Sequence, residues 1–128
     1  MLSVEIKSEN DVYQAVTLVS HLIKNRSFSE SDKQCIFISV LELTRNILDH
    51  TEEKGIFRCE MVQNEFRFTC IDKGPGIENL NDILRGFHKS SHGLGVGLSG
   101  AKRLMDDLRI ETSKEGTRII GIKKERYK

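Results

Sequence analysis

Residues 55–74, GIFRCEMVQNEFRFTCIDKG, alternate apolar and polar side chains on either side of a short polar stretch. A period of two is typical of strands with one buried face, so this segment predicts an antiparallel hairpin. The residues assigned to the buried face are Phe57, Cys59, Met61, Phe66, Phe68 and Cys70. Such a face must pack against a second layer. This hairpin therefore constrains the fold more than any other segment of the sequence does.

The other segments supply helices and strands around this hairpin. The predicted helices are residues 8–25, 28–53, 98–108 and a short piece at 79–87; the other predicted strands are residues 2–8 and a closing hairpin at 109–124. This order favours an α+β fold with two layers, in which helices cover one face of a mixed, mostly antiparallel sheet. A length of 128 residues fits a single domain over residues 1–128.

Charge and composition exclude some classes of function. The formal net charge is +1, which argues against non-specific nucleic-acid binding because that requires an excess of Lys and Arg. No apolar run is long enough to cross a bilayer, and the first residues lack a charged-then-apolar signal pattern. We therefore expect a cytoplasmic protein that binds neither nucleic acid nor membrane. The basic last dozen residues predict a solvated strand and a frayed tail.

The three cysteines, Cys35, Cys59 and Cys70, fit no zinc-binding spacing and no disulfide framework. We expect all three to be small buried thiols. If residues 62–66 themselves form the turn of the first hairpin, Cys59 and Cys70 can lie opposite each other across the strands; a bridge between them then stays open, although it is not expected in the cytosol.

Polar residues line one face of the second helix. Glu42, Asn46 and His50 are four residues apart, which places them on one side of a helix. Their neighbours are strongly apolar, and an ionised carboxylate buried without a partner is costly, so Glu42 has a task or a ligand if it is buried. The alternative is a solvated stripe on an amphipathic helix, and this segment alone does not decide between the two.

Two glycine-containing segments follow. Asp72 stands at the end of an apolar strand, and Gly74-Pro75-Gly76 turns the chain at once. A carboxylate there can accept a hydrogen bond from an exocyclic amine, although a plain Asp-x-Gly turn is also common. In HGLGVGLSGAK, glycines precede a helix, whose unpaired N–H groups and dipole favour phosphates. A flexible loop is the alternative, and the segment lacks the ending of a P-loop.

Taken in order, E-x-x-x-N, D-x-G-x-G, G-x-G-x-G before a helix and Gly116-Thr117 resemble the GHKL ATPase superfamily and its Bergerat fold. The resemblance covers about residues 3–124. ELTRNI, DKGPGI and GLGVGLSGAKRLMDDL are most similar to the RsbT-type serine/threonine kinases of the stressosome, within the anti-sigma and switch-kinase branch. Leu98-Ser99-Gly100 departs from those kinases, and His50 follows the anti-sigma pattern.

The resemblance implies roles for individual residues. Glu42 matches the general base, Asn46 the Mg²⁺ ligand and Asp72 the adenine-recognition residue. The cofactor-binding residues implied are Asn46, Asp72, Gly74, Gly76, Ile77, Gly93, Leu94, Gly95, Val96, Gly97 and Thr117, with ATP and Mg²⁺ as cofactors. Residues 86–97 are the candidate lid. The phosphates also require cations, and the sequence does not choose among Arg45, Arg85, His88, Lys89 and Lys102.

The resemblance also implies an activity and partners. It predicts an ATP-dependent protein serine/threonine kinase that phosphorylates a STAS-domain protein, engages a PPM-type phosphatase and acts by partner switching. The alternative is an anti-sigma factor that binds a sigma factor and phosphorylates its antagonist. A nucleotide-gated scaffold without transfer is disfavoured because it has no need of Glu42. A histidine-kinase fragment is disfavoured because the chain has no room for a dimerising helix pair.

Overall fold

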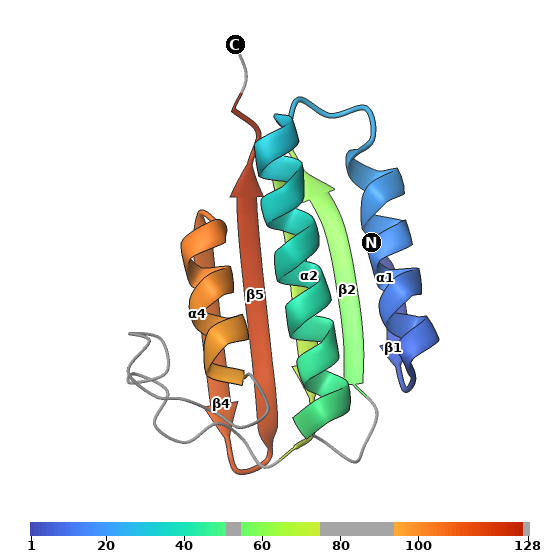
Figure 1. Cartoon of the computed structure of the whole chain (residues 1–128), viewed down its shortest axis with the longest axis vertical. Helices are drawn as coiled ribbons and strands as arrows, with labels where there is room; N and C mark the ends of the chain where they lie inside the picture. Colours follow the sequence, from blue (N-terminus) through green and yellow to red (C-terminus); the bar gives the residue numbers. More distant parts are fainter. Residues whose placement is uncertain (51–54, 75–93, 127–128) are drawn as a thin grey trace.

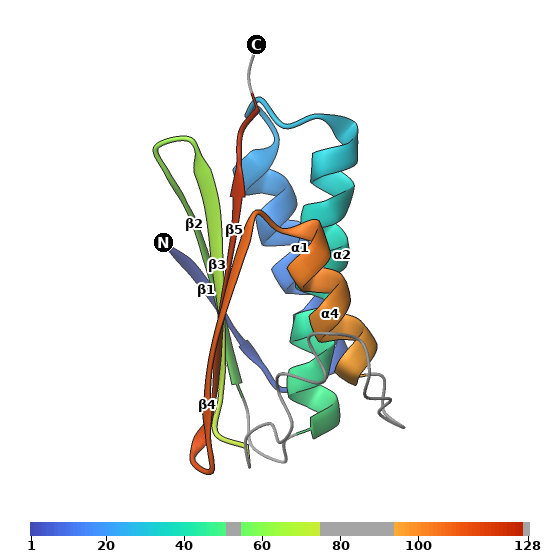
Figure 2. The ribbon, with the colours of Figure 1, turned by 90° about the vertical axis from the view of Figure 1, so that its left-hand side faces the viewer.

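A single antiparallel sheet backed by helices forms the protein (Figures 1 and 2). The structure is a computed structural model that describes residues 1–50, 55–74 and 94–126. Its elements are β1 (Leu2–Ile6), α1 (Glu9–Ile23), α2 (Glu30–His50), β2 (Gly55–Val62), β3 (Glu65–Asp72), α4 (Leu94–Leu104), β4 (Asp107–Ser113) and β5 (Gly116–Lys124). The strand order is β1-β2-β3-β5-β4, and every described pair is antiparallel. The predicted α+β, two-layer class is confirmed, while the short helix expected at 79–87 lies outside the described residues.

The β2–β3 hairpin forms as its alternation predicts. Phe57 pairs with Cys70, Cys59 with Phe68 and Met61 with Phe66, and their side chains face the helices. Cys59 and Cys70 are therefore offset along the strands rather than opposite each other, and both thiols are free. The condition for a facing pair, a turn formed by residues 62–66, is not met, because the turn consists of Gln63 and Asn64 alone.

The two thiols are buried, as predicted, whereas Cys35 is only half-buried. Burial raises the pKa of the Cys59 thiol to about 11, since a thiolate would lose its hydration there. Burial likewise raises the pKa of the Cys70 thiol, with a smaller contribution from the nearby carboxylate of Asp72. Both cysteines are thus protonated at neutral pH.

Helix α2 buries one stripe against the sheet. Its fully buried side chains include Ile36, Val40, Leu43 and Ile47, three or four residues apart, as helical packing requires. The Ser29 hydroxyl accepts a hydrogen bond from the Asp32 N–H at 3.0 Å and caps the start of the helix. Helices α1 and α4 flank α2 on the same face of the sheet (Figure 1).

Helix α4 lies four residues nearer the N-terminus than predicted. The sequence predicts a helix over 98–108, whereas α4 spans Leu94–Leu104 and β4 begins at Asp107. The reason is tertiary pairing: Leu108 lies opposite Gly121 and Ile110 opposite Ile119, so both apolar side chains are used in the sheet rather than on a helix.

Gly121 of β5 sits against the ring of Phe68, and an added Cβ would lie 2.4 Å from that ring. We expect Gly121→Ala to lower the free energy of unfolding by about 1–3 kcal/mol, because the tightly packed ring must move. Urea denaturation followed by circular dichroism measures this. The matched control is Gly100→Ala in α4, where an added Cβ meets nothing within 4 Å. The free energy of unfolding of Gly100→Ala should rise by about 0.5–1 kcal/mol. An equal fall in the free energy of unfolding of both variants would contradict the packing argument.

The last described residues, 123–126, are bound to the rest of the molecule, whereas the sequence predicts a solvated strand and a frayed tail. Lys123 is buried, and the side chains of Glu125 and Arg126 make ion pairs with Arg26 and Asp106. Among the described helices, none has the length and apolar character needed to cross a membrane.

Candidate functional site

Helix α2 presents Glu42 to solvent. Glu42 lies on the exposed stripe that also carries Ile38 and Asp49, away from the stripe that contacts the sheet. Of the two alternatives that the sequence leaves open, the solvated stripe holds for Glu42. The consequence is chemical: a solvated carboxylate on the outer side of a helix is accessible to a group carried by another macromolecule.

Asn46, one turn further along α2, is half-buried. Its Nδ2 atom is inaccessible to solvent and has no hydrogen-bond partner within the described residues. A buried polar atom left unpaired costs about 1–3 kcal/mol, so this carboxamide is a group that a ligand would satisfy. Because the oxygen and nitrogen of an amide are assigned from their surroundings, either atom can be the one directed at a ligand.

The end of β3 brings Asp72 beside β5. Asp72 is half-buried and pairs with the buried Thr117, whose hydroxyl lies 2.8 Å from that of Thr112 on β4. The Asp72 Oδ1 atom accepts a hydrogen bond from the Gly74 N–H at 2.8 Å, which fixes the side chain at the start of the turn. This bond uses one carboxylate oxygen; no hydrogen bond to Oδ2 occurs within the described residues.

Two glycines bring these elements close together. At Gly116, with φ of 154°, an added Cβ would lie 2.2 Å from the Asp72 carbonyl oxygen. At Gly55, it would lie 2.6 Å from the Ile47 side chain of α2 and 2.7 Å from the Ile71 carbonyl. Only a residue without a side chain allows α2 to approach the sheet this closely beside Asn46. The sequence places Gly55 between the helix and the hairpin, but nothing in its local pattern indicates this contact.

The glycine-rich run is partly helical. The backbone of Leu94, Gly95, Val96 and Gly97 forms the first turn of α4, so the last four residues of the predicted lid belong to the helix. The first N–H groups of a helix have no partner within it and favour an anion. Figure 1 shows the start of α4, the C-terminal end of α2 and the β4–β5 turn at the same end of the molecule. The predicted site residues Gly76, Ile77 and Gly93 lie outside the described residues.

One candidate cation is engaged elsewhere. Arg45 forms an ion pair with Glu9 at 2.8 Å and lies 3.4 Å from the Tyr13 hydroxyl, both on α1. Lys102 is exposed on α4. The remaining candidates, Arg85, His88 and Lys89, lie in the part of the chain that the structure does not describe. In residues 1–50, 55–74 and 94–126, no cluster of three metal-binding side chains occurs.

A single carboxamide beside phosphates suits magnesium, because this ion keeps several waters and takes its other ligands from the phosphates. The carboxylate of Asp72 can accept a hydrogen bond from an amine, and the first N–H groups of α4 favour an anion. The fold and these groups are those of a small nucleotide-binding domain.

Comparison with known proteins agrees with this class. Residues 31–126 match the family model described as histidine kinase-, DNA gyrase B-, and HSP90-like ATPase. The chain belongs to this ATPase family, so the resemblance to the GHKL superfamily is confirmed, as is the prediction of ATP as its nucleotide.

Two kinds of relative cover nearly the whole chain. The serine/threonine-protein kinase RsbT of Bacillus subtilis is 34% identical over 94% of this chain and 93% of its own length. The anti-sigma F factor of Clostridium novyi is 30% identical over 92% of this chain and 88% of its own.

Solved structures agree on the fold. The RsbU and RsbW domains of a Mycobacterium tuberculosis protein align with a TM-score of 0.67 at 15% identity, over 97% of this chain and 32% of that one. The catalytic domain of the histidine kinase ThkA aligns with a TM-score of 0.63 at 20% identity, over 98% and 99% of the two chains.

Proposed function

We propose that this protein is an ATP-dependent protein serine/threonine kinase that regulates a stress or sigma-factor pathway by exchanging partners. The observation that carries the proposal is the pair on α2: an exposed carboxylate at Glu42 and, one turn away, the unpaired carboxamide of Asn46. The similarity to RsbT over almost the full length supports the same activity.

Glu42 is the proposed general base. Phosphoryl transfer requires positioning and charge neutralisation more than covalent chemistry by the protein. The carboxylate orients the serine or threonine hydroxyl of the partner and accepts its proton as the hydroxyl oxygen attacks the γ-phosphorus and the bond to ADP breaks. Its exposure supports this role, because the hydroxyl arrives on a second protein.

Asn46 is the proposed magnesium ligand through its side-chain oxygen. Bound Mg²⁺ would neutralise charge on the phosphates. With the amide turned so that its oxygen takes the buried position that has no partner, Asn46 fits such a ligand. The Asp72 carboxylate accepts a hydrogen bond from the exocyclic amine of adenine. Thr117, directly opposite on β5, supports Asp72 in this role. The backbone N–H groups at the start of α4 receive the phosphates.

The proposed partners follow from the relatives. A STAS-domain protein is the proposed substrate, and a PPM-type phosphatase is the proposed second partner. The similarity to anti-sigma F factors favours a second candidate, in which the protein binds a sigma factor and phosphorylates the sigma factor's antagonist. The cytoplasm is the proposed location.

A transfer assay tests the proposal. Purified protein is incubated with γ-labelled ATP, Mg²⁺ and candidate STAS-domain proteins, and we expect label on a serine or threonine of one of them. Chelation of Mg²⁺ should remove the label. If the protein binds ATP but labels no STAS-domain protein, the kinase proposal is wrong. Stable capture of a sigma factor in a parallel pull-down would favour the second candidate.

A further inference from the structure

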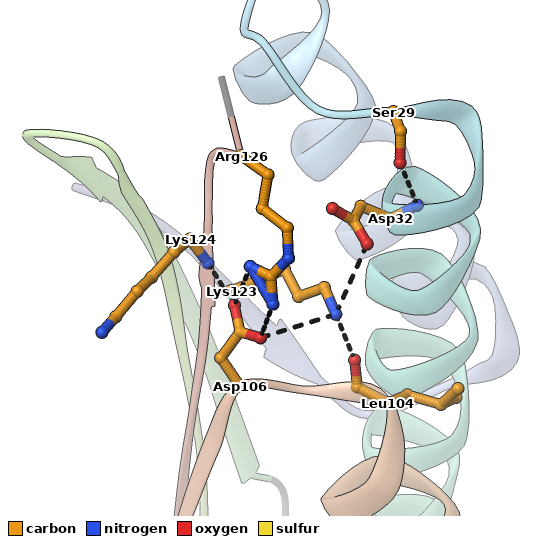
Figure 3. Close-up of polar contacts among 7 residues, drawn as sticks. All are labelled: Ser29, Asp32, Leu104, Asp106, Lys123, Lys124 and Arg126. Carbon is orange, nitrogen blue, oxygen red and sulfur yellow. Dashed lines mark hydrogen bonds and ion pairs between the residues drawn. The ribbon is translucent and has the colours of Figure 1, made fainter. Parts of the chain in front are cut away.

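A buried lysine on β5 joins α2, the end of α4 and the turn before β4 (Figure 3). Lys123 of β5 is 6% exposed, and its Nζ donates to the carbonyl oxygen of Leu104 at 2.6 Å. The same Nζ lies 3.6 Å from Asp32 of α2 and 3.9 Å from Asp106, which precedes β4. We call Asp32, Leu104, Asp106 and Lys123 the lysine cluster.

The partners of Lys123 are themselves held in place. The Asp32 N–H donates to the Ser29 hydroxyl at the start of α2, which holds the backbone of Asp32 in the first turn. Asp106 accepts from the Lys124 N–H at 2.7 Å and pairs with Arg126. A buried ammonium group is costly unless it is paired and hydrogen-bonded, and here both conditions are met.

The lysine cluster connects two helices that also border the candidate site. Leu104 is the last residue of α4, and a cation is favourable at a helix C-terminus because of the helix dipole. Helices α2 and α4 lie side by side and run in opposite directions (Figures 1 and 2). The start of α2 and the end of α4 therefore meet at Lys123, while Asn46 and the first turn of α4 lie towards the other end.

A small tilt of α4 about the lysine cluster would displace the first turn of α4 at the candidate site. The 11 residues of α4 span about 16 Å at about 1.5 Å per residue. A tilt of about 4° around Leu104 would move the first turn of α4 by about 1 Å, and a displacement of this size can cost about 10²-fold in rate.

We propose that Lys123 is a positioning residue for the phosphate end of the nucleotide site. This inference rests on the proposed function, because it assumes that the phosphates bind at the start of α4. Lys123 touches no nucleotide: it fixes the end of α4 against α2 and thereby the distance between the first turn of α4 and Asn46. Asp72 and Thr117 recognise the base from β3 and β5, so base recognition does not depend on this tilt.

The test compares ATP with adenosine, which has the base but no phosphates. For Lys123→Met we expect about a tenfold rise in the Kd for ATP, equivalent to the loss of about one hydrogen bond, and no change in the Kd for adenosine. Calorimetry with Mg²⁺ measures both, at a temperature where circular dichroism shows every variant folded. Asp32→Asn, which weakens the same contact and keeps the Ser29 cap, should shift the ATP Kd in the same direction by less. It serves as the test variant if Lys123→Met does not fold.

The matched control is Lys124→Met. Lys124 is the next residue of β5, but its side chain points away from the lysine cluster (Figure 3), so both affinities should equal those of the unmodified protein. An unchanged ATP affinity in the folded Lys123→Met and Asp32→Asn variants would overturn the inference, as would equal losses for ATP and adenosine. If the unmodified protein does not bind ATP, the proposed function itself fails.

Discussion

Glu42→Gln is expected to lower the rate of phosphoryl transfer to a protein substrate by about 10²–10⁴-fold, the usual contribution of a general base. The amide keeps the shape of the side chain but cannot accept the proton of the attacking hydroxyl. Glu42 is exposed, so the variant should fold with unchanged stability. Its affinity for ATP should also be unchanged, because the base acts on the partner's hydroxyl and not on the nucleotide.

The measurement is single-turnover transfer from labelled ATP, with ATP affinity determined separately. Asp49→Asn is the matched control: it removes the same charge from the same exposed stripe of α2 and should keep full transfer. Transfer at the unmodified rate in Glu42→Gln would remove the base from the proposed mechanism. A parallel loss in both variants would assign the effect to surface charge instead.

Asp72→Asn is expected to weaken ATP binding by about tenfold to hundredfold, the value of a hydrogen bond to a charged group. Asparagine keeps one side-chain oxygen, so the bond from the Gly74 N–H can persist and the turn can keep its shape. The second oxygen becomes an NH₂ group. This group and the exocyclic amine of adenine are both hydrogen-bond donors, so no hydrogen bond forms between them.

A nucleotide comparison sharpens this test. GTP carries a carbonyl where ATP carries the amine, so Asp72→Asn should lose affinity for ATP while its affinity for GTP stays equal or rises. Asp107→Asn, on the sheet face away from the helices, is the control and should bind both as the unmodified protein does. An unchanged preference for ATP in Asp72→Asn would exclude base recognition by this carboxylate.

The sequence predicts well those features that depend on local periodicity. The β2–β3 hairpin and its buried face follow from alternation alone. The boundary of α4 is wrong because Leu108 and Ile110 suit either a helix or a strand, and only pairing with β5 decides between them.

The candidate site is predictable in its spacing but not in its surroundings. The four-residue interval places Glu42 and Asn46 on one side of α2, yet their exposure depends on where α1 and α4 flank that helix. The lysine cluster joins residues more than seventy positions apart, such as Asp32 and Lys123, and no local pattern brings them together. The same holds for Gly55 against Ile47, a contact that exists only in three dimensions.

Cys70 can serve as a native probe of transient opening of the sheet at β3. Its thiol is buried and protonated, and it lies on β3 two residues before Asp72, on the same side of the strand. An alkylating reagent attacks the thiolate, so modification of this atom must await a transient separation of the strands. The time course of that modification therefore reports how often β3 separates from its neighbouring strands beside Asp72, with no substitution in the chain.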